Sequence, residues 1–200
     1  GFGFVRLSII DLTQAGHQPM FSRDRRFVLV YNGEIYNYLE LKKELEQQGH
    51  RFQTRTDTEV LLGAYQQWGE DCLHRFNGMW AFVIFDTLTG NIFGARDRYG
   101  IKPFYYTFEN DRFVFASEIP ALLKALNNKP VPNHQSIFDY LVFSRTDQTE
   151  ETFFQGIKKL QHGHSFNFQG KNFLLNKWYD LKNRINRPFK GHEEFREVLS

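Results

Sequence analysis

One short apolar stretch, residues 79–85, constrains the fold of this chain more than any other segment. Its β-branched and aromatic side chains favour an extended strand. Residues 81–85 are apolar at every position, whereas a strand with one face in water alternates apolar and polar side chains. We therefore expect layers of structure on both sides of its sheet. The stretch is far shorter than the ~18 apolar residues that a membrane-spanning helix needs.

Two amphipathic helices are predicted before this strand. The first carries three apolar side chains on one helical face, at Tyr38, Leu41 and Leu45, and Gly49 stands where it would end. The second opens with the capping-box pattern of residues 56–59 and closes at Gly69. Since strands are predicted at residues 4–10 and 26–31, two strands precede the two helices.

The second half of the chain is predicted to be rich in strands. Four strands joined by short turns are expected to form an antiparallel meander, over residues 80–85, 92–95, 104–108 and 113–116. Two helical segments and two more strands are expected after them, over residues 120–125, 136–143, 165–168 and 173–179. Strands, paired helices and again strands favour the α+β class, with helices covering sheets.

The composition narrows the classes of protein and of site. Cys72 is the single cysteine among 200 residues, so no disulfide can form within the chain, and a reducing, cytoplasmic location is expected. The formal net charge of +2 is too weak to indicate attraction to nucleic acid or to a membrane. The seven histidines are scattered and lack the spacing of a zinc site, so no metal is expected.

Four polar segments are candidates for chemistry. Arg6 lies inside a predicted strand, where its guanidinium either faces solvent or holds a substrate carboxylate. Asn32-Gly33 is a common hairpin turn, yet a helix is predicted next, and an Asn side chain with the following N–H also suits an oxyanion. Asp57 is explained by capping of the second helix, and could alternatively receive an ammonium group. The charged turn at residues 95–103 is explained by Arg–Asp pairing and its glycine.

Six sequence blocks resemble consecutive blocks of the glutamine-hydrolysing asparagine synthetase family. They have the family's order and spacing and span nearly the first 120 residues: RLSIID (6–11), GHQPM (16–20), YNGEIYN (31–37), TDTEV (56–60), NGMWAF (77–82) and RDRYGIKP (96–103). The block ASEI at residues 116–119 continues the series, and residues 152–160 are similar to a later segment of the same family.

The resemblance implies a class II glutamine amidotransferase domain of the N-terminal-nucleophile hydrolase type. Its fold is a four-layer αββα sandwich, two antiparallel sheets covered by helices. In this family an N-terminal cysteine thiolate attacks the side-chain amide of glutamine, and the covalent intermediate splits one difficult displacement into two easier ones.

The family's site residues map onto nine positions of this sequence. The glutamine-binding set is Arg6, Leu7, Ser8, Ile9, Ile10, Asn32, Gly33, Glu34 and Asp57. The resemblance implies that Arg6 holds the α-carboxylate of glutamine and Asp57 its α-ammonium group. The catalytic residues it implies here are Asn32, through its side chain, and Gly33, through its N–H, which together form the oxyanion hole.

The resemblance also implies that the chain is a piece of a larger enzyme. The family's nucleophile stands before the equivalent of Arg6, where this sequence has no cysteine, and Cys72 is expected to be an inert, buried thiol. Residues 1–182 would be the amidotransferase domain without its N-terminal segment. Residues 183–200 would be a linker and the start of an ATP-dependent synthetase domain. The 200 residues alone are expected to be inactive.

The implied function is glutamine hydrolysis that supplies ammonia for ATP-dependent amidation of aspartate. No cofactor is expected within these residues, and ATP and Mg²⁺ are expected in the synthetase domain. The expected partners are glutamine, that synthetase domain and, as one option, a second copy of the chain; neither nucleic acid nor a membrane is expected. Two alternatives stay open: amidation of another acceptor in an antibiotic or polysaccharide pathway, and a non-catalytic module that binds glutamine or a partner.

Overall fold

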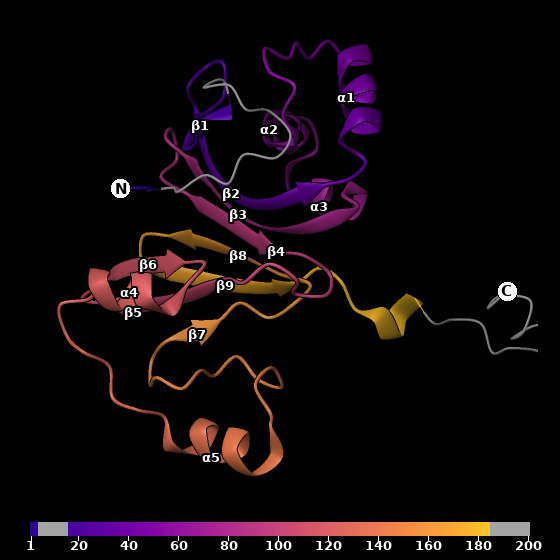
Figure 1. Cartoon of the computed structure of the whole chain (residues 1–200). Coiled ribbons are helices and arrows are strands. Elements are labelled where there is room, and N and C mark those ends of the chain that lie inside the picture. The colour runs from indigo at the N-terminus through magenta and orange to yellow at the C-terminus, as the bar shows by residue number, and fades with distance from the viewer. Residues whose placement is uncertain (4–15, 185–200) are drawn as a thin grey trace, which may run out of the picture.

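The computed structural model places two antiparallel sheets face to face, with helices packed against them (Figure 1). It describes residues 1–3 and 16–184. The strand predicted at residues 4–10 and most of the predicted linker at 183–200 lie outside the described residues. The α+β class and the sandwich of two antiparallel sheets agree with the prediction. No helix in the described parts of the chain is long and apolar enough to cross a membrane.

The first sheet has six described strands, in the spatial order β1-β2-β3-β4-β8-β9. They are β1 (Met20–Phe21), β2 (Phe27–Ile35), β3 (Gly78–Asp86), β4 (Ile92–Arg96), β8 (His164–Gln169) and β9 (Asn172–Lys177). The second sheet has three described strands in the order β6-β5-β7. They are β5 (Tyr105–Glu109), β6 (Arg112–Ala116) and β7 (Lys158–Lys159).

The predicted four-strand meander is wrong. Strands β3 and β4 form one hairpin and β5 and β6 form another, but β4 pairs next with β8, and β5 pairs with β7. After β4 the chain leaves the first sheet through the turn around Asp97 and enters the second sheet. Hairpin signals are local and predict one sheet for both hairpins, whereas the pairing of β4 with β8 joins segments that are distant in sequence.

The long strand pair β2–β3 divides the interior into two cores. Its register runs from Phe27 opposite Asp86 to Ile35 opposite Gly78. Alternate side chains pack under the helices, namely Leu29, Tyr31, Trp80, Phe82 and Ile84. The others pack against the second sheet, namely Val30, Ala81 and Val83. The covering of β3 on both faces is therefore confirmed.

Helices α1 (Tyr38–Gln47) and α2 (Asp57–Trp68) follow the prediction closely. The hydroxyl of Thr56 accepts the N–H of Glu59 at 3.2 Å, which is the N-cap half of the capping box. The carboxylate of Glu59 instead accepts the N–H groups of Gln53 and Thr54. A short turn η2 (Gly69–Asp71) and α3 (Cys72–Arg75) lead into β3.

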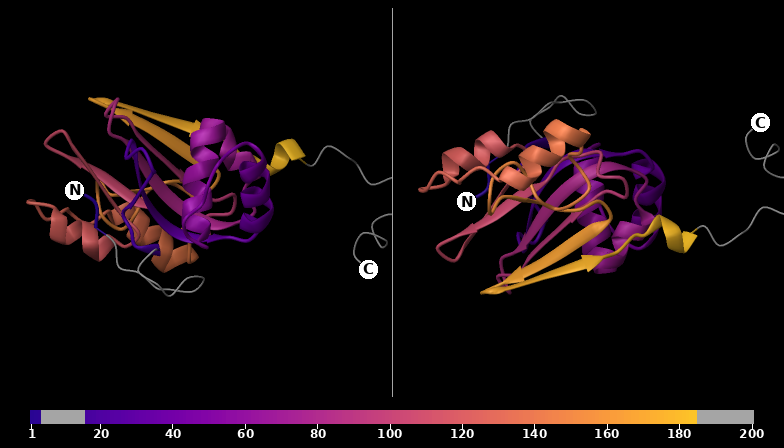
Figure 2. Two further views of the ribbon diagram at one scale, coloured as in Figure 1. Left: turned by 90° about the horizontal axis from the view of Figure 1, so that it is seen from above. Right: turned by 90° about the horizontal axis from the view of Figure 1, so that it is seen from below.

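The remaining helices are α4 (Ile119–Ala125), α5 (His134–Phe143) and the turn η3 (Leu181–Arg184). Helix α4 packs against the β5–β6 hairpin, and its Leu122 is buried. Helix α5 lies at the end of the structure opposite to α1 and α2 in Figure 1, and Figure 2 views the molecule from these two ends. In the described structure none of its residues is buried, and its side chains Phe138, Tyr140, Leu141, Val142 and Phe143 are exposed.

The turn after β4 is held by one buried carboxylate. Asp97 Oδ1 accepts the N–H groups of Tyr99 and Ile101, and Oδ2 accepts those of Lys102 and Trp80. Arg96 donates to the carbonyls of Gly100, Lys102 and Leu160 at 2.6–2.7 Å. These bonds between side chains and backbone close the turn, where the sequence suggested Arg–Asp pairing.

We expect Asp97→Asn to lower the free energy of unfolding by about 3 kcal/mol. The new amide NH2 would face two backbone N–H donors that now share one carboxylate oxygen, and those buried donors would lose their acceptor. Urea unfolding of the 200-residue chain measures the change. Asp111→Asn is the matched control, because its ion pair with Lys171 is exposed on both sides. An Asp97→Asn chain as stable as wild type would contradict this account of the turn.

Candidate functional site

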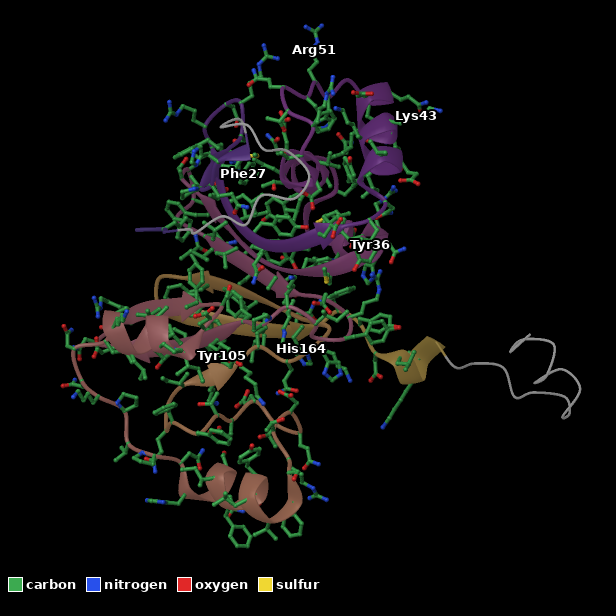
Figure 3. All side chains as sticks on the ribbon, viewed as in Figure 1. Phe27, Tyr36, Lys43, Arg51, Tyr105 and His164 are labelled. Carbon is green, nitrogen blue, oxygen red and sulfur yellow. The ribbon has the colours of Figure 1, made fainter. Side chains whose placement is uncertain are left out.

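Four of the predicted site residues line one cavity of about 770 Å³: Asn32, Gly33, Glu34 and Asp57. Its walls come from β2, from the start of α2 and from the segment between β6 and α4. In Figure 3, Phe27 and Tyr36 mark the start of β2 and the residue after its end, and Tyr105 marks the second sheet. Arg6, Leu7, Ser8, Ile9 and Ile10 lie outside the described residues.

Asp57 is buried at the first position of α2. Its Oδ2 accepts two hydrogen bonds, from the Tyr31 hydroxyl at 2.7 Å and from the Ile35 N–H at 3.0 Å. Burial raises the pKa of this carboxyl above its ordinary value, and the two hydrogen bonds act in the opposite direction by stabilising the charged form. Since Thr56 is the N-cap of α2, capping alone does not account for Asp57.

The edge of β2 that faces away from β3 carries a row of backbone N–H donors. The N–H of Tyr31 donates to Gln18 Oε1 at 2.6 Å, and the N–H of Ile35 donates to Asp57. Because every second N–H of a strand points the same way, the N–H of Gly33 is directed to this edge between them. The cavity therefore presents a backbone donor beside a carboxylate.

Asn32 and Gly33 lie inside β2, opposite Ala81 and Trp80. The strand was predicted to end at residue 31, and the structure extends it to Ile35, so the Asn-Gly pair forms no turn. A side chain at position 33 does not fit, because its Cβ would lie 2.3 Å from the Met79 carbonyl oxygen. Glycine at this position follows from the close approach of β3.

The side chain of Asn32 reaches the segment that follows β6. Its Nδ2 donates to Ser117 Oγ at 3.2 Å, across 85 positions of sequence. Sequence reasoning missed Ser117 as a site residue, although it belongs to the block at residues 116–119 that continues the family resemblance. The bond to Ser117 fixes the direction in which the Asn32 amide points.

The lining of the cavity includes more acidic than basic side chains, and Asp57 is one of the acidic ones. Glu34 and Glu118 line it as well, and Lys102 is the single cationic residue among the described lining residues. Such a wall suits a ligand that carries an ammonium group, while the Asn32 amide and the Gly33 N–H suit an oxygen that gains negative charge. Across the described ranges, no group of three or more His, Cys, Asp or Glu side chains could hold a metal ion.

Cys72 takes no part in this cavity. It is fully buried in the core under α2, and burial together with Glu70 and Asp71 raises the pKa of its thiol well above the ordinary value. A thiol of this kind stays protonated at neutral pH and is a poor nucleophile. The expectation of a buried cysteine is confirmed, and the raised pKa agrees with an unreactive thiol.

The fold of this chain resembles that of a solved glutamine amidotransferase. A solved glutamine phosphoribosylpyrophosphate amidotransferase from Bacillus subtilis superposes with a TM-score of 0.64, over 88% of this chain and 34% of that one. At 22% identity this likeness shows a shared fold. The chain belongs to the glutamine amidotransferase domain family, whose sequence profile matches residues 1–179.

Two curated relatives come from the same bacterium. Asparagine synthetase [glutamine-hydrolyzing] 1 of Bacillus subtilis strain 168 is 40% identical over 179 residues, covering 90% of this chain and 28% of the relative. Asparagine synthetase [glutamine-hydrolyzing] 3 of the same strain is 37% identical over 183 residues, covering 90% of this chain and 30% of the relative. The chain thus spans less than a third of the length of these relatives.

Replacing Asp57 with Asn should change how stability depends on pH. Because the folded-state pKa of Asp57 is raised, the folded chain binds more protons than the unfolded chain above the ordinary value of 3.8. The wild-type free energy of unfolding should therefore fall, relative to Asp57→Asn, as pH rises from 3.8 through the folded-state pKa. Urea unfolding at a series of pH values measures this difference.

The control for this experiment has the opposite sign. A hydrogen bond from Ser22 lowers the pKa of Asp24 in the folded chain, so wild type should gain stability relative to Asp24→Asn as pH rises toward 3.8. If the two variants showed the same pH trend, the assignment of Asp57 as a carboxyl that resists ionisation would be wrong.

Proposed function

We propose that this chain is the glutaminase domain of a glutamine-dependent asparagine synthetase. It binds glutamine and releases glutamate and ammonia, and the ammonia serves the ATP-dependent amidation of aspartate. One observation carries the proposal: the Asn32 amide, the Gly33 N–H and the Asp57 carboxylate meet at a single cavity on β2. The names of the two Bacillus subtilis relatives support it.

Each group at the cavity has a defined part in this reaction. Asp57 receives the α-ammonium group of glutamine, and Arg6 holds its α-carboxylate through a bidentate pair. When the amide carbon of the side chain is attacked, negative charge develops on its oxygen. The Asn32 Nδ2 and the Gly33 N–H stabilise that charge, and Glu34 completes the pocket.

The attacking group is a cysteine thiolate that lies outside these 200 residues. Cys72 is buried away from the cavity and does not serve this role. Attack forms a bond from sulfur to the amide carbon and breaks the carbon–nitrogen bond, and the nitrogen leaves as ammonia after taking up the proton that the cysteine thiol gave up. Water then releases glutamate from the covalent intermediate.

The larger protein is proposed to have two domains. Residues 1–182 form the amidotransferase domain, and residues 183–200 lead into a synthetase domain that holds ATP and Mg²⁺. The length of the relatives supports this division, because the matched region is less than a third of each. A cytoplasmic location and assembly into a homodimer belong to the same proposal.

Glutamine binding by the 200-residue chain tests the ligand assignment. Isothermal titration should show binding that Arg6→Ala or Asp57→Asn weakens by about 30-fold or more, because each change leaves one charge of the ligand without its partner. Arg51→Ala and Asp111→Asn are the controls, since both residues are exposed and neither lines the cavity. Wild-type chain that binds no glutamine, or site variants that bind as wild type does, would refute the proposal.

The oxyanion role is tested in the longer polypeptide that hydrolyses glutamine. Asn32→Ala should lower the rate of ammonia release by about 10²–10³-fold, the usual effect of removing one oxyanion donor. Glutamine affinity should change much less than the rate, because the donor acts on charge that develops during the reaction. Near-normal turnover of Asn32→Ala would exclude this residue from the oxyanion hole.

A further inference from the structure

Tyr31 touches the candidate ammonium-binding carboxylate from within the core. It lies on β2 directly before the Asn-Gly pair, its side chain is 4% exposed, and its hydroxyl donates to Asp57 Oδ2 at 2.7 Å. The family resemblance assigns no role to this tyrosine. We propose that Tyr31 is a positioning residue, which orients Asp57 toward the α-ammonium group of the bound amino acid; this inference rests on the proposed function.

The two donors on Asp57 define the direction of its carboxylate. The Tyr31 hydroxyl and the Ile35 N–H both bind Oδ2, and Oδ1 is the oxygen that neither of them uses. Two donors on one oxygen, a side-chain hydroxyl and a backbone N–H of the same strand, hold Oδ2 in place and restrict rotation of the carboxylate. A ligand ammonium then meets an acceptor that is already oriented and loses less free energy in ordering it.

Tyr31 itself is held rigidly, so that its hydroxyl is a fixed point. The side-chain amide of Gln18 binds the Tyr31 main chain twice, through Oε1 to its N–H at 2.6 Å and through Nε2 to its carbonyl at 3.0 Å. On the other side, Tyr31 pairs with Phe82 of β3. A site built on a strand supported along both edges is more precise than one built on a loop.

The hydroxyl also sets the charge of Asp57. Burial and the nearby Asp57 raise the pKa of Tyr31 far above its ordinary value, so the phenol is protonated and can donate at neutral pH. Its hydrogen bond favours the ionised carboxylate and opposes the effect of burial. Loss of the hydroxyl should raise the pKa of Asp57 further and weaken its attraction for an ammonium group.

A pair of ligands separates this role from general support of the fold. Glutamine carries the α-ammonium group, whereas glutaramate, the 4-carbamoylbutanoate, has the same chain without it. Isothermal titration of the 200-residue chain should show that Tyr31→Phe weakens glutamine binding about 10-fold and leaves glutaramate binding unchanged. The pH below which glutamine binding declines should also move upward, since the Asp57 pKa rises.

Tyr106→Phe is the matched control. Tyr106 is as buried as Tyr31, at 3% exposed, but it belongs to the core between the sheets and does not line the cavity. Removing its hydroxyl should change neither ligand's affinity. In an Asp57→Asn background, Tyr31→Phe should no longer alter the ratio of the two affinities, because the group through which it acts is gone.

The outcomes distinguish the two levels of the proposal. Wild-type chain that binds neither ligand would overturn the proposed function and this inference with it. Wild-type chain that prefers glutamine, with the same preference in Tyr31→Phe, would overturn only the positioning role. If Tyr31→Phe weakened the binding of glutamine and of glutaramate equally, the tyrosine would only support the fold, and the inference would be rejected as well.

Discussion

The burial of β3 on both faces is the constraint on which the other parts of this structure depend. A strand whose neighbouring side chains point into two different cores needs helices on one side and a second sheet on the other. Its partner β2 shares that position for nine residues. The backbone of β2 is thereby fixed, and beyond the short strand β1 the edge of β2 that faces away from β3 carries backbone donors at regular spacing.

The candidate site uses this edge because the interior is already filled. On β2, Tyr31 points toward the helices and donates a hydrogen bond to Asp57. The next residue, Asn32, points the other way and donates a hydrogen bond to Ser117. The strand thus brings a carboxylate and an amide to the same cavity from opposite faces. The precision of the site comes from the sheet, while its chemistry comes from residues contributed by segments distant in sequence.

Features with a local cause could be predicted from the sequence. Helix α2 begins and ends where Thr56 and Gly69 indicate, since capping depends on a few neighbouring residues. The sheet to which β5 belongs could not be predicted, because hairpin signals do not encode pairing between distant strands. Likewise, the hydrogen bond between Tyr31 and Asp57 joins two residues that are 26 positions apart, and no local sequence pattern at either residue predicts it. Asp57 was a candidate from its place at the start of the predicted helix and from the family resemblance, whereas Tyr31 emerged only from the geometry.

Helix α5 has a consequence for how this chain behaves in solution. Its apolar side chains are hydrated, with Leu141 at 73% exposed, and they lie outside both cores. Transfer of such surface out of water lowers the heat capacity of the system. Any association that covers α5 should therefore carry a negative heat-capacity change. The cavity beside Asp57 is lined by many polar groups, so calorimetry at several temperatures can tell an event at the helix from an event at the cavity.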